Sequence, residues 1–324
     1  MTRDSGEDWE TCRLDAVVDS LSEVVTPLTS VAPDDPLEEL DVIGDAIGDA
    51  DVIGMGEASH GTREFFQFKH RLFRYLVQHH GVRMLGLEAN FAGMLAVNEY
   101  VLEGKGSAVR ALSQDCIYGS YQNESVLALI EWIREFNQGR HPDDKIRFHG
   151  FDVQDPSAAC ARLESHFEKV EPETLAEVST PLEQLIDEGI PDLSDDEALN
   201  RHLDAREAVV STLEEAIETN ETAHVNATSR SDVRRVKRLI WMIDRGREQF
   251  VTIQQGRAES GANIRVRDSA MAAQVQWLLR HEPADEIALW GHNAHLTRGA
   301  FGGGTVRHKQ GIPSLGKNLA LLDT

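Results

Sequence analysis

Four short apolar segments of the chain each end in residues that can carry charge or transfer a proton. They are Val52 to Met55, followed by Glu57 and His60; Arg83 to Leu87, ending at Glu88; Ile146 to Phe151, ending at Asp152; and Glu286 to Trp290, followed by His292 and His295. Carboxylates and imidazoles act as general acids and bases and as metal ligands. In none of the four segments does the equivalent cluster stand at the beginning. The pattern indicates strands that deliver chemical groups to one edge of a sheet.

Glu57 and His60 form an E-x-x-H motif at a strand-to-helix turn. A carboxylate beside a histidine fixes its tautomer and stabilises the imidazolium, so the imidazole can take a proton from water. The start of the helix acts in the opposite sense and helps to keep the resting imidazole neutral. Taken alone, the spacing favours a simpler interpretation, in which Ser59 or Thr62 caps the helix and His60 is a surface residue.

Two interpretations of the whole set stay open. His292 and His295 form H-x-x-H, and with Glu57, His60 and Glu88 they can make a zinc or iron site. Without a metal, the same groups can polarise a carbonyl or protonate a leaving alkoxide. The chain has no G-x-S-x-G motif, so a nucleophile-elbow mechanism has no candidate serine.

Other residues are candidates for supporting roles. A carboxylate at the end of an apolar strand, as at Glu88, needs a cation or donor to offset its desolvation. Lys69 and Arg71 are the candidates, although Arg71 is better explained as a solvated charge on a helix surface. Asp152 is favoured as an orienting acceptor. Ordinary loop packing is favoured over pocket lining for the tyrosines of Cys116 to Asn123.

The order strand, helix, strand around these residues predicts a parallel sheet with crossover helices, in which the carboxyl ends of the strands meet at one edge. The first crossover helix begins near Thr62 and ends at Gly81, a residue suited to the left-handed position after a helix. Its expected apolar residues are Phe65, Phe66, Leu72, Phe73 and Leu76.

From Pro156 to Arg280 the periodicity is almost wholly helical, and the polar segment Thr219 to Ser231 is expected to join two long helices. The predicted fold class is α/β, with a mostly parallel sheet and a large helical subdomain. We expect an acidic N-terminal segment (1–36), a first part of the core (37–155), the helical subdomain (156–262) and a return to the core (263–324). The subdomain can form one wall of a substrate cleft, and the glycine-rich loop Gly299 to Gly304 is expected to be a flexible linkage.

The composition narrows the class of partner. The 324 residues hold 32 Lys+Arg against 55 Asp+Glu, a formal charge of -23 that repels nucleic acids and anionic membranes. Such an acidic, lysine-poor chain suits high salt, which screens like charges, so we expect a halophilic source. The three cysteines form no motif, and no signal peptide or membrane-length apolar run is seen. We therefore expect a soluble, cytoplasmic protein that acts on a small molecule.

Five short motifs occur along the chain. They are G-E-A-S-H-G-T-R-E-F-F at Gly56 to Phe66, L-E-A-N-F at Leu87 to Phe91, G-F-D-V-Q at Gly150 to Gln154, R-D-S-A-M at Arg267 to Met271 and G-H-N-A-H at Gly291 to His295. In this order they resemble the erythromycin esterase family, some of whose members are labelled succinoglycan biosynthesis proteins. The similarity runs from about Leu37 to Leu319. The joint occurrence of the first and last motifs favours a catalytic role for His60.

The resemblance implies hydrolysis of a carboxylic ester, macrolactones in the best-known relatives, without a metal or other cofactor. It implies that His60 is the general base, that Glu57 orients it, and that Glu88, His292 and His295 complete the site. Arg63, Lys69 and Asp152 are expected to bind substrate or support the site. A metal-dependent hydrolase and a non-catalytic accessory protein of polysaccharide metabolism remain the alternatives.

Two departures from the family pattern stand out. Lys69 occupies a position where the resistance esterases carry arginine, so it keeps the charge but lacks the planar fork for bidentate contacts. Relatives also continue past the motif matched by Pro313 to Leu319, whereas this chain stops at Thr324. On this basis we expect final elements of the core to be absent.

Overall fold

The structure is a computed structural model that describes residues 7–22, 25–256, 261–298 and 312–321. Its centre is a four-stranded parallel sheet with the strand order β1-β4-β2-β3. The strands are β1 (Val52–Glu57), β2 (Met84–Asn90), β3 (Arg147–Asp152) and β4 (Ile287–His292). The predicted α/β class with a parallel sheet is confirmed, and each strand lies where the sequence indicated, with β2 running two residues beyond Glu88.

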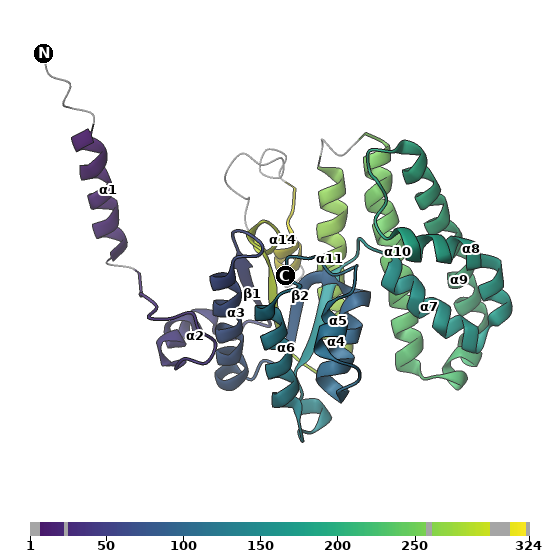
Figure 1. Ribbon diagram of the computed structural model, residues 1–324, viewed down its shortest axis with the longest axis horizontal. Coiled ribbons are helices and arrows are strands. Elements are labelled where there is room, and N and C mark those ends of the chain that lie inside the picture. Colours follow the sequence, from purple (N-terminus) through teal and green to yellow (C-terminus); the bar gives the residue numbers. More distant parts are fainter. Residues whose placement is uncertain (1–6, 23–24, 257–260, 299–311, 322–324) are drawn as a thin grey trace, which may run out of the picture.

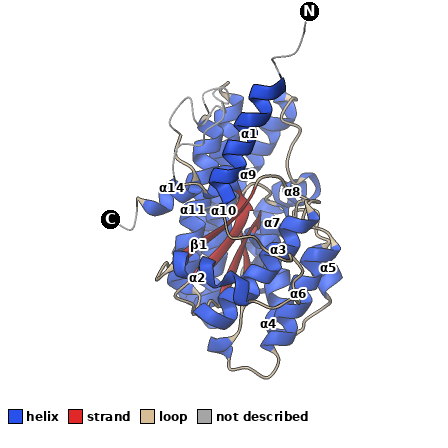
Figure 2. Ribbon diagram, turned by 90° about the vertical axis from the view of Figure 1, so that its left-hand side faces the viewer, coloured by secondary structure: helices blue, strands red, loops and turns tan. Residues whose placement is uncertain are grey.

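Helices cover both faces of the sheet (Figures 1 and 2). The chain crosses from β1 to β2 through α3 (Arg63–Tyr75), which ends in a π-helical turn (Leu76–His80), and from β2 to β3 through three helices. These are α4 (Phe91–Glu103), α5 (Ala108–Leu112) and α6 (Glu124–Asn137). A long helical excursion separates β3 from β4, which returns between β1 and β2.

The strand side chains alternate between two apolar cores, as period-two geometry requires. Ala288 and Trp290 of β4 pack into the core shared with α3 and α6, while Ile287 and Leu289 pack into the core shared with the later helices. All four are fully or almost fully buried. Because both faces of every central strand are covered, the strands read as continuous apolar runs.

The helical part comprises α7 (Ser157–Val170), α8 (Pro172–Glu188), α9 (Asp196–Ala227), α10 (Arg230–Gln254) and α11 (Ala262–His281). Helices α7 to α10 lie together at one end of the molecule, and α11 lies against the sheet (Figure 1). Two long helices do meet within Thr219 to Ser231, but the connection is shorter than expected, because α9 continues to Ala227, past non-helical backbone angles at Asn220. Ser229 then caps α10 by accepting a hydrogen bond from the Asp232 amide. Most of the polar stretch is therefore exposed helix surface.

The remaining short elements flank the sheet. They are α1 (Glu7–Ser22), a 3₁₀ turn (Glu38–Leu40), α2 (Asp41–Ile47), a second 3₁₀ turn (Pro142–Asp144), α12 (Asn293–Leu296) and α14 (Leu315–Ala320). In Figure 1, α1 stands away from the rest of the chain. The predicted linkage Gly299 to Gly304 lies outside the described residues.

The predicted amphipathic character of α3 is largely confirmed. Phe66 and Phe73 are buried, and Gly81 takes the left-handed conformation after the helix, with φ of 77°. Phe65, however, is exposed. Arg71 is not a solvated surface charge either: it is buried and pairs with Glu39. A buried guanidinium persists because carboxylate and carbonyl acceptors surround it.

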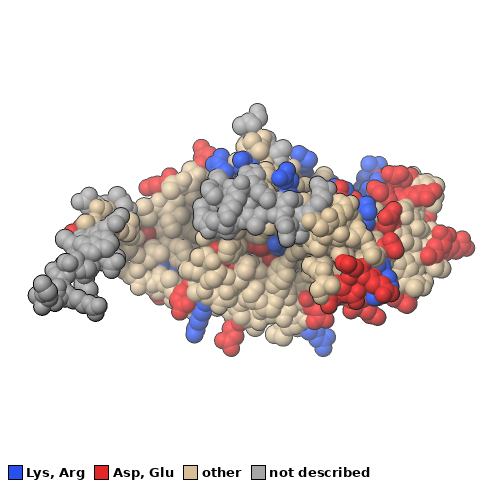
Figure 3. Space-filling model, turned by 90° about the horizontal axis from the view of Figure 1, so that it is seen from above, with Lys and Arg blue, Asp and Glu red and all other residues tan. Residues whose placement is uncertain are grey.

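Charge is unevenly distributed over the surface. Seen from above, many Asp and Glu side chains gather over the helical end of the molecule, with a few Lys and Arg among them (Figure 3). Within the described residues, no helix combines the length and the apolar character needed to cross a membrane.

Candidate active site

The carboxyl ends of the four strands bring together the groups that the sequence placed there. Glu57 ends β1 and is the register partner of His292, which ends β4. Asp152 ends β3 opposite Asn90 of β2, and Glu88 lies two residues before that strand's end. Parallel pairing explains the convergence, since it aligns the carboxyl ends of all four strands at one edge.

Glu57 and His60 form the most direct pair. His60 Nδ1 donates to Glu57 Oε1 at 2.7 Å; the imidazole is 39% exposed, whereas the carboxylate is fully buried. No hydrogen bond joins His60 Nε2 to any residue that the structure describes, so this nitrogen is available as an acceptor. The hydrogen bond to Glu57 raises the pKa of His60 and outweighs the opposing effect of burial. The pair has the geometry of an oriented general base.

The second oxygen of Glu57 has two donors. Lys69 Nζ and Trp290 Nε1 each lie 2.8 Å from Oε2. Burial alone would raise the pKa of Glu57, but its bond to His60 and the charge of Lys69 lower it overall. Burial lowers the pKa of Lys69 to about 8. Lys69 thus pairs with Glu57 and not with Glu88, whose charge acts on it only as a smaller effect without a direct bond.

Arg267 of α11 offsets the charge of Glu88 instead. Its Nη2 donates to Glu88 at 3.2 Å and to Asp152 at 2.8 Å, and its Nε donates to the other oxygen of Asp152 at 3.1 Å. Burial would lower the pKa of Arg267, but the charge of Asp152 raises it well above its ordinary value. Burial would likewise raise the pKa of Asp152, which the Arg267 charge lowers. Asp152 is therefore a buried partner of this arginine, as a supporting role predicts.

The two histidines of H-x-x-H differ in their surroundings. His292 Nε2 donates to the Ala58 carbonyl at 3.0 Å, and its Nδ1 accepts from the Ala294 amide at 3.0 Å. His295 donates from Nδ1 to Asp268 at 2.7 Å, and its Nε2 lies 3.1 Å from Glu88. Both ring nitrogens of each histidine therefore already have partners.

Two tyrosines for which the sequence favoured loop packing place their hydroxyls in the site. The Tyr118 hydroxyl lies 2.7 Å from Asp152 Oδ2, and the hydroxyl of the fully buried Tyr121 lies 3.3 Å from His60 Nδ1. Burial raises the pKa of both phenols, so they serve as neutral groups. Tyr121 packs in the apolar core as that interpretation predicts, whereas Tyr118 also lines a small cavity beside Asp152. The available signal was two tyrosines in an aperiodic segment between helices.

The start of α3 borders the base. Its N-cap residue, Thr62, makes no capping bond, because its hydroxyl lies 2.9 Å from the Ser59 hydroxyl instead. Arg63, the first residue of α3, is exposed and forms no ion pair with the described residues. Its role in substrate binding stays a prediction.

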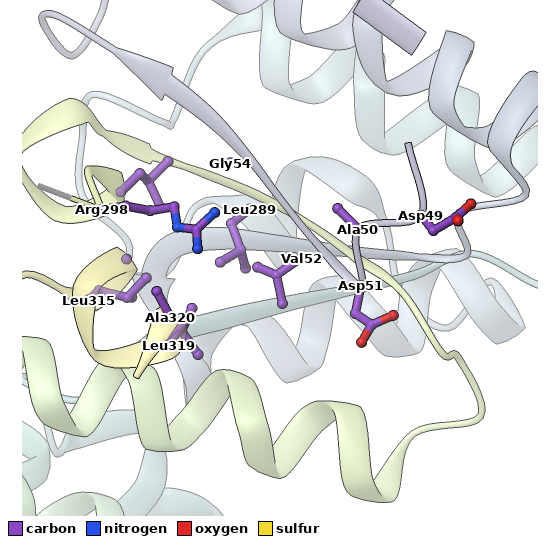
Figure 4. A pocket seen from close by; sticks show the side chains of 12 residues that line it. Asp49, Ala50, Asp51, Val52, Gly54, Leu289, Arg298, Leu315, Leu319 and Ala320 are labelled. Atoms are coloured by element: carbon purple, nitrogen blue, oxygen red, sulfur yellow. The ribbon is translucent and has the colours of Figure 1, made fainter. Parts of the chain in front are cut away.

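Two cavities lie near this edge and along the sheet. A cavity of about 70 Å³ adjoins the site and is lined by Asn90, Asp115, Cys116, Tyr118, Asp152, Gln154, Asp155 and Ile190. A larger one of about 370 Å³ lies beside β1, where Val52, Leu289 and Leu319 face one another (Figure 4). None of the acid-base residues lines the larger cavity, so size does not identify the site here.

The same donor groups are not arranged as a metal site in the described part of the chain. Among the residues that the structure describes, no group of three or more His, Cys, Asp or Glu side chains is placed so that it could hold a metal ion. The imidazoles and carboxylates of the site instead bond to one another and to Lys69, Arg267 and Trp290.

Comparison with known proteins agrees with the motifs. The chain is 30% identical over 124 residues to erythromycin esterase type II of Escherichia coli, covering 37% of this chain and 28% of that protein. It is 24% identical to erythromycin esterase type I of the same species, covering 80% of this chain and 65% of the relative. The chain thus spans less than two thirds of the length of either relative.

A solved structure of a succinoglycan biosynthesis protein has the same fold, with a TM-score of 0.72 and 21% identity over 95% of this chain and 72% of that one. The sequence model of the erythromycin esterase family matches residues 77–320. With most of its length matched in this way, the chain belongs to the erythromycin esterase family.

Proposed function

We propose that the protein hydrolyses a carboxylic ester or macrolactone by metal-independent attack of water that His60 activates. The observation that carries this proposal is the bond between His60 Nδ1 and buried Glu57, at 2.7 Å, which leaves Nε2 of a partly exposed imidazole to act as the base. Family membership supports a hydrolase of this kind.

In the proposed reaction, Nε2 of His60 takes a proton from water while the water oxygen attacks the ester carbonyl carbon. The tetrahedral oxyanion then collapses, and the carbon–oxygen bond to the alcohol breaks. The leaving alkoxide receives the proton from the His60 imidazolium, which restores the neutral base. Glu57 stabilises that imidazolium, because its buried carboxylate stays ionised beside Lys69.

The oxyanion is assigned to amide groups at the turn and at the start of α3. This helix begins without a side-chain cap, so its first amides are available beside His60. Both ring nitrogens of His295 already have partners, Asp268 on one side and Glu88 and Arg267 on the other, so this ring holds the strand ends together. The His292 ring likewise supports the turn through Ala58.

The substrate class rests on the relatives, two of which are named erythromycin esterases. The Glu57–His60 pair suits any ester whose carbonyl reaches Nε2. The helical part and the segment around Tyr118 are the regions from which selectivity would arise. A macrolide is accordingly one member of the panel to be tested.

The test is mass-spectrometric detection of hydrolysis at molar KCl across macrolactones and simple esters, for wild type and His60→Asn, with and without chelator. Product that depends on His60 and survives chelation supports the proposal. Stoichiometric metal in the purified protein, with activity lost to chelator, would replace it with a metal-dependent hydrolase. A ligand that binds tightly and is returned intact, without turnover of any ester, would favour a binding protein.

A further inference from the structure

Trp290 lies directly beneath the proposed base pair and is fully buried. Trp290 lies two residues before His292 on β4, and His292 is paired in register with Glu57 of β1. The side chains of Trp290 and Glu57 therefore lie on the same face of the sheet. Its indole Nε1 donates to Glu57 Oε2 at 2.8 Å. A fully buried tryptophan would otherwise leave an N–H without a partner, which is costly.

The indole is held in one orientation from several directions. The Phe66 ring meets it edge-on with centroids 4.9 Å apart, and the Tyr121 ring does so at 6.3 Å. Lys69 Nζ lies over the ring, 5.0 Å from its centroid. The direction of the Trp290 N–H is therefore set by packing before Glu57 is considered.

The two carboxylate oxygens of Glu57 have different hydrogen-bond partners. Oε2 accepts from both Lys69 and Trp290, while Oε1 bonds to His60. An ammonium group has three protons on a flexible stem and can move between carboxylate oxygens, whereas an indole N–H has one fixed direction. The part of the arrangement that selects a single carboxylate orientation is thus Trp290.

We propose that Trp290 is a positioning residue for hydrolysis, which fixes the Glu57 carboxylate so that Oε1 faces His60 Nδ1. This inference rests on the proposed function of His60, although its structural half can be tested without any substrate. When the indole N–H is removed, Lys69 can bridge both oxygens of Glu57. The bond that holds His60 would then weaken.

The test compares wild type with Trp290→Phe, which keeps an aromatic ring but removes the N–H. The control is Trp277→Phe on α11, where the tryptophan packs edge-on against Phe91 at 5.8 Å. The first measurement is an NMR titration of the His60 imidazole, assigned by the signal lost in His60→Asn. The second is kcat and kcat/KM against pH for an ester that wild type hydrolyses.

We expect the His60 pKa to fall toward its ordinary value in Trp290→Phe and to stay unchanged in Trp277→Phe. Because the Trp290 N–H donates to a charged carboxylate, we expect its removal in Trp290→Phe to lower kcat by about tenfold to hundredfold. The acidic limb of the pH profile should move down with the pKa. If Trp290 only stabilised the fold, its replacement would lower the melting temperature but leave the His60 pKa and the acidic limb of the pH profile unchanged.

A Trp290→Phe protein with the wild-type His60 titration and kcat within twofold of wild type would overturn the inference. Wild type without His60-dependent turnover would instead remove the proposed function, and the titration would still decide whether Trp290 fixes Glu57. If Trp290→Phe does not fold, site-specific replacement of Trp290 by β-(3-benzothienyl)alanine keeps the shape without the N–H. The same two outcomes then apply.

Discussion

The Glu88 carboxylate accepts a hydrogen bond from the backbone amide of His292 at 2.7 Å, although 204 positions separate the two residues. This bond joins the end of β2 to the end of β4, which lie side by side in the sheet. Between them, Gly291 leaves the room that Glu88 needs, because a Cβ there would lie 3.0 Å from Glu88 Oε2. The junction of β4 and α12, which carries both site histidines, is therefore anchored on a buried carboxylate.

His60→Asn tests the assignment of the base. We expect turnover to fall by about 10² to 10⁴, the usual contribution of a general base, with little change in melting temperature because His60 is partly exposed. His141→Asn, at an exposed histidine before β3, is the matched control and should keep full activity. Wild-type turnover by His60→Asn would exclude His60 from the mechanism.

The pH dependence of hydrolysis follows from the raised pKa of His60. The base must be unprotonated, so kcat/KM should increase as pH rises through a value above 6.5 and then level off. Glu57→Gln removes the carboxylate that raises this pKa, so the limb should shift to lower pH while the maximal rate falls. A limb that stays in place in Glu57→Gln would show that Glu57 does not set the His60 pKa.

Arg267→Met tests the bridge between Glu88 and Asp152. Removing one partner of a buried ionic group leaves uncompensated charge, and we expect the free energy of unfolding to fall by about 3 to 5 kcal/mol. The lowered pKa of Asp152 contributes stability that is present above the unfolded value and lost as pH falls through the folded value. The deficit in urea unfolding should therefore narrow in acid.

Arg201→Met, at an arginine whose side chain is 54% exposed, is the control for that loss of charge. It should change the unfolding free energy by only a few tenths of a kcal/mol, roughly the value of a surface ion pair. Equal effects of the two substitutions would contradict the bridging role of Arg267.

The buried side chain of His70 should make the folded state less stable in acid, independently of catalysis. Burial lowers its pKa to about 4, so between that value and 6.5 the unfolded chain binds a proton that the folded chain does not. This depressed pKa makes folding less favourable as pH falls through the window, by up to about 3 kcal/mol. His70→Phe should flatten the decline in a series of urea melts, and an unchanged slope would refute the assignment.

The formal charge of -23 predicts salt-dependent stability. Acidic side chains gather over the helical end, where molar KCl would screen their repulsion (Figure 3). The melting temperature should therefore rise from low salt to molar KCl. A temperature that stays level or falls would count against a halophilic adaptation.

The sequence by itself determined the strands, their order along the chain and the groups at their ends, because apolar runs and helical periodicity are local properties. Glu57, His60, Glu88, Asp152 and His295 could be placed at one edge from parallel topology alone. The ion-pair partner of each charged side chain could not be predicted in this way. Lys69 lies on Glu57 rather than Glu88, and Arg267 crosses from α11 to Glu88 and Asp152, since only packing decides which buried charges meet.

Tertiary structure also decided the roles of the aromatic residues. In the sequence, Trp290 is one more apolar residue of a strand, and Tyr121 belongs to a segment without periodicity. Their polar atoms meet Glu57 and His60 only because β4 lies beside β1 and the loop before α6 packs against His60. A hydrogen bond depends on distances of a few tenths of an ångström and on direction, which residue spacing along the chain does not encode.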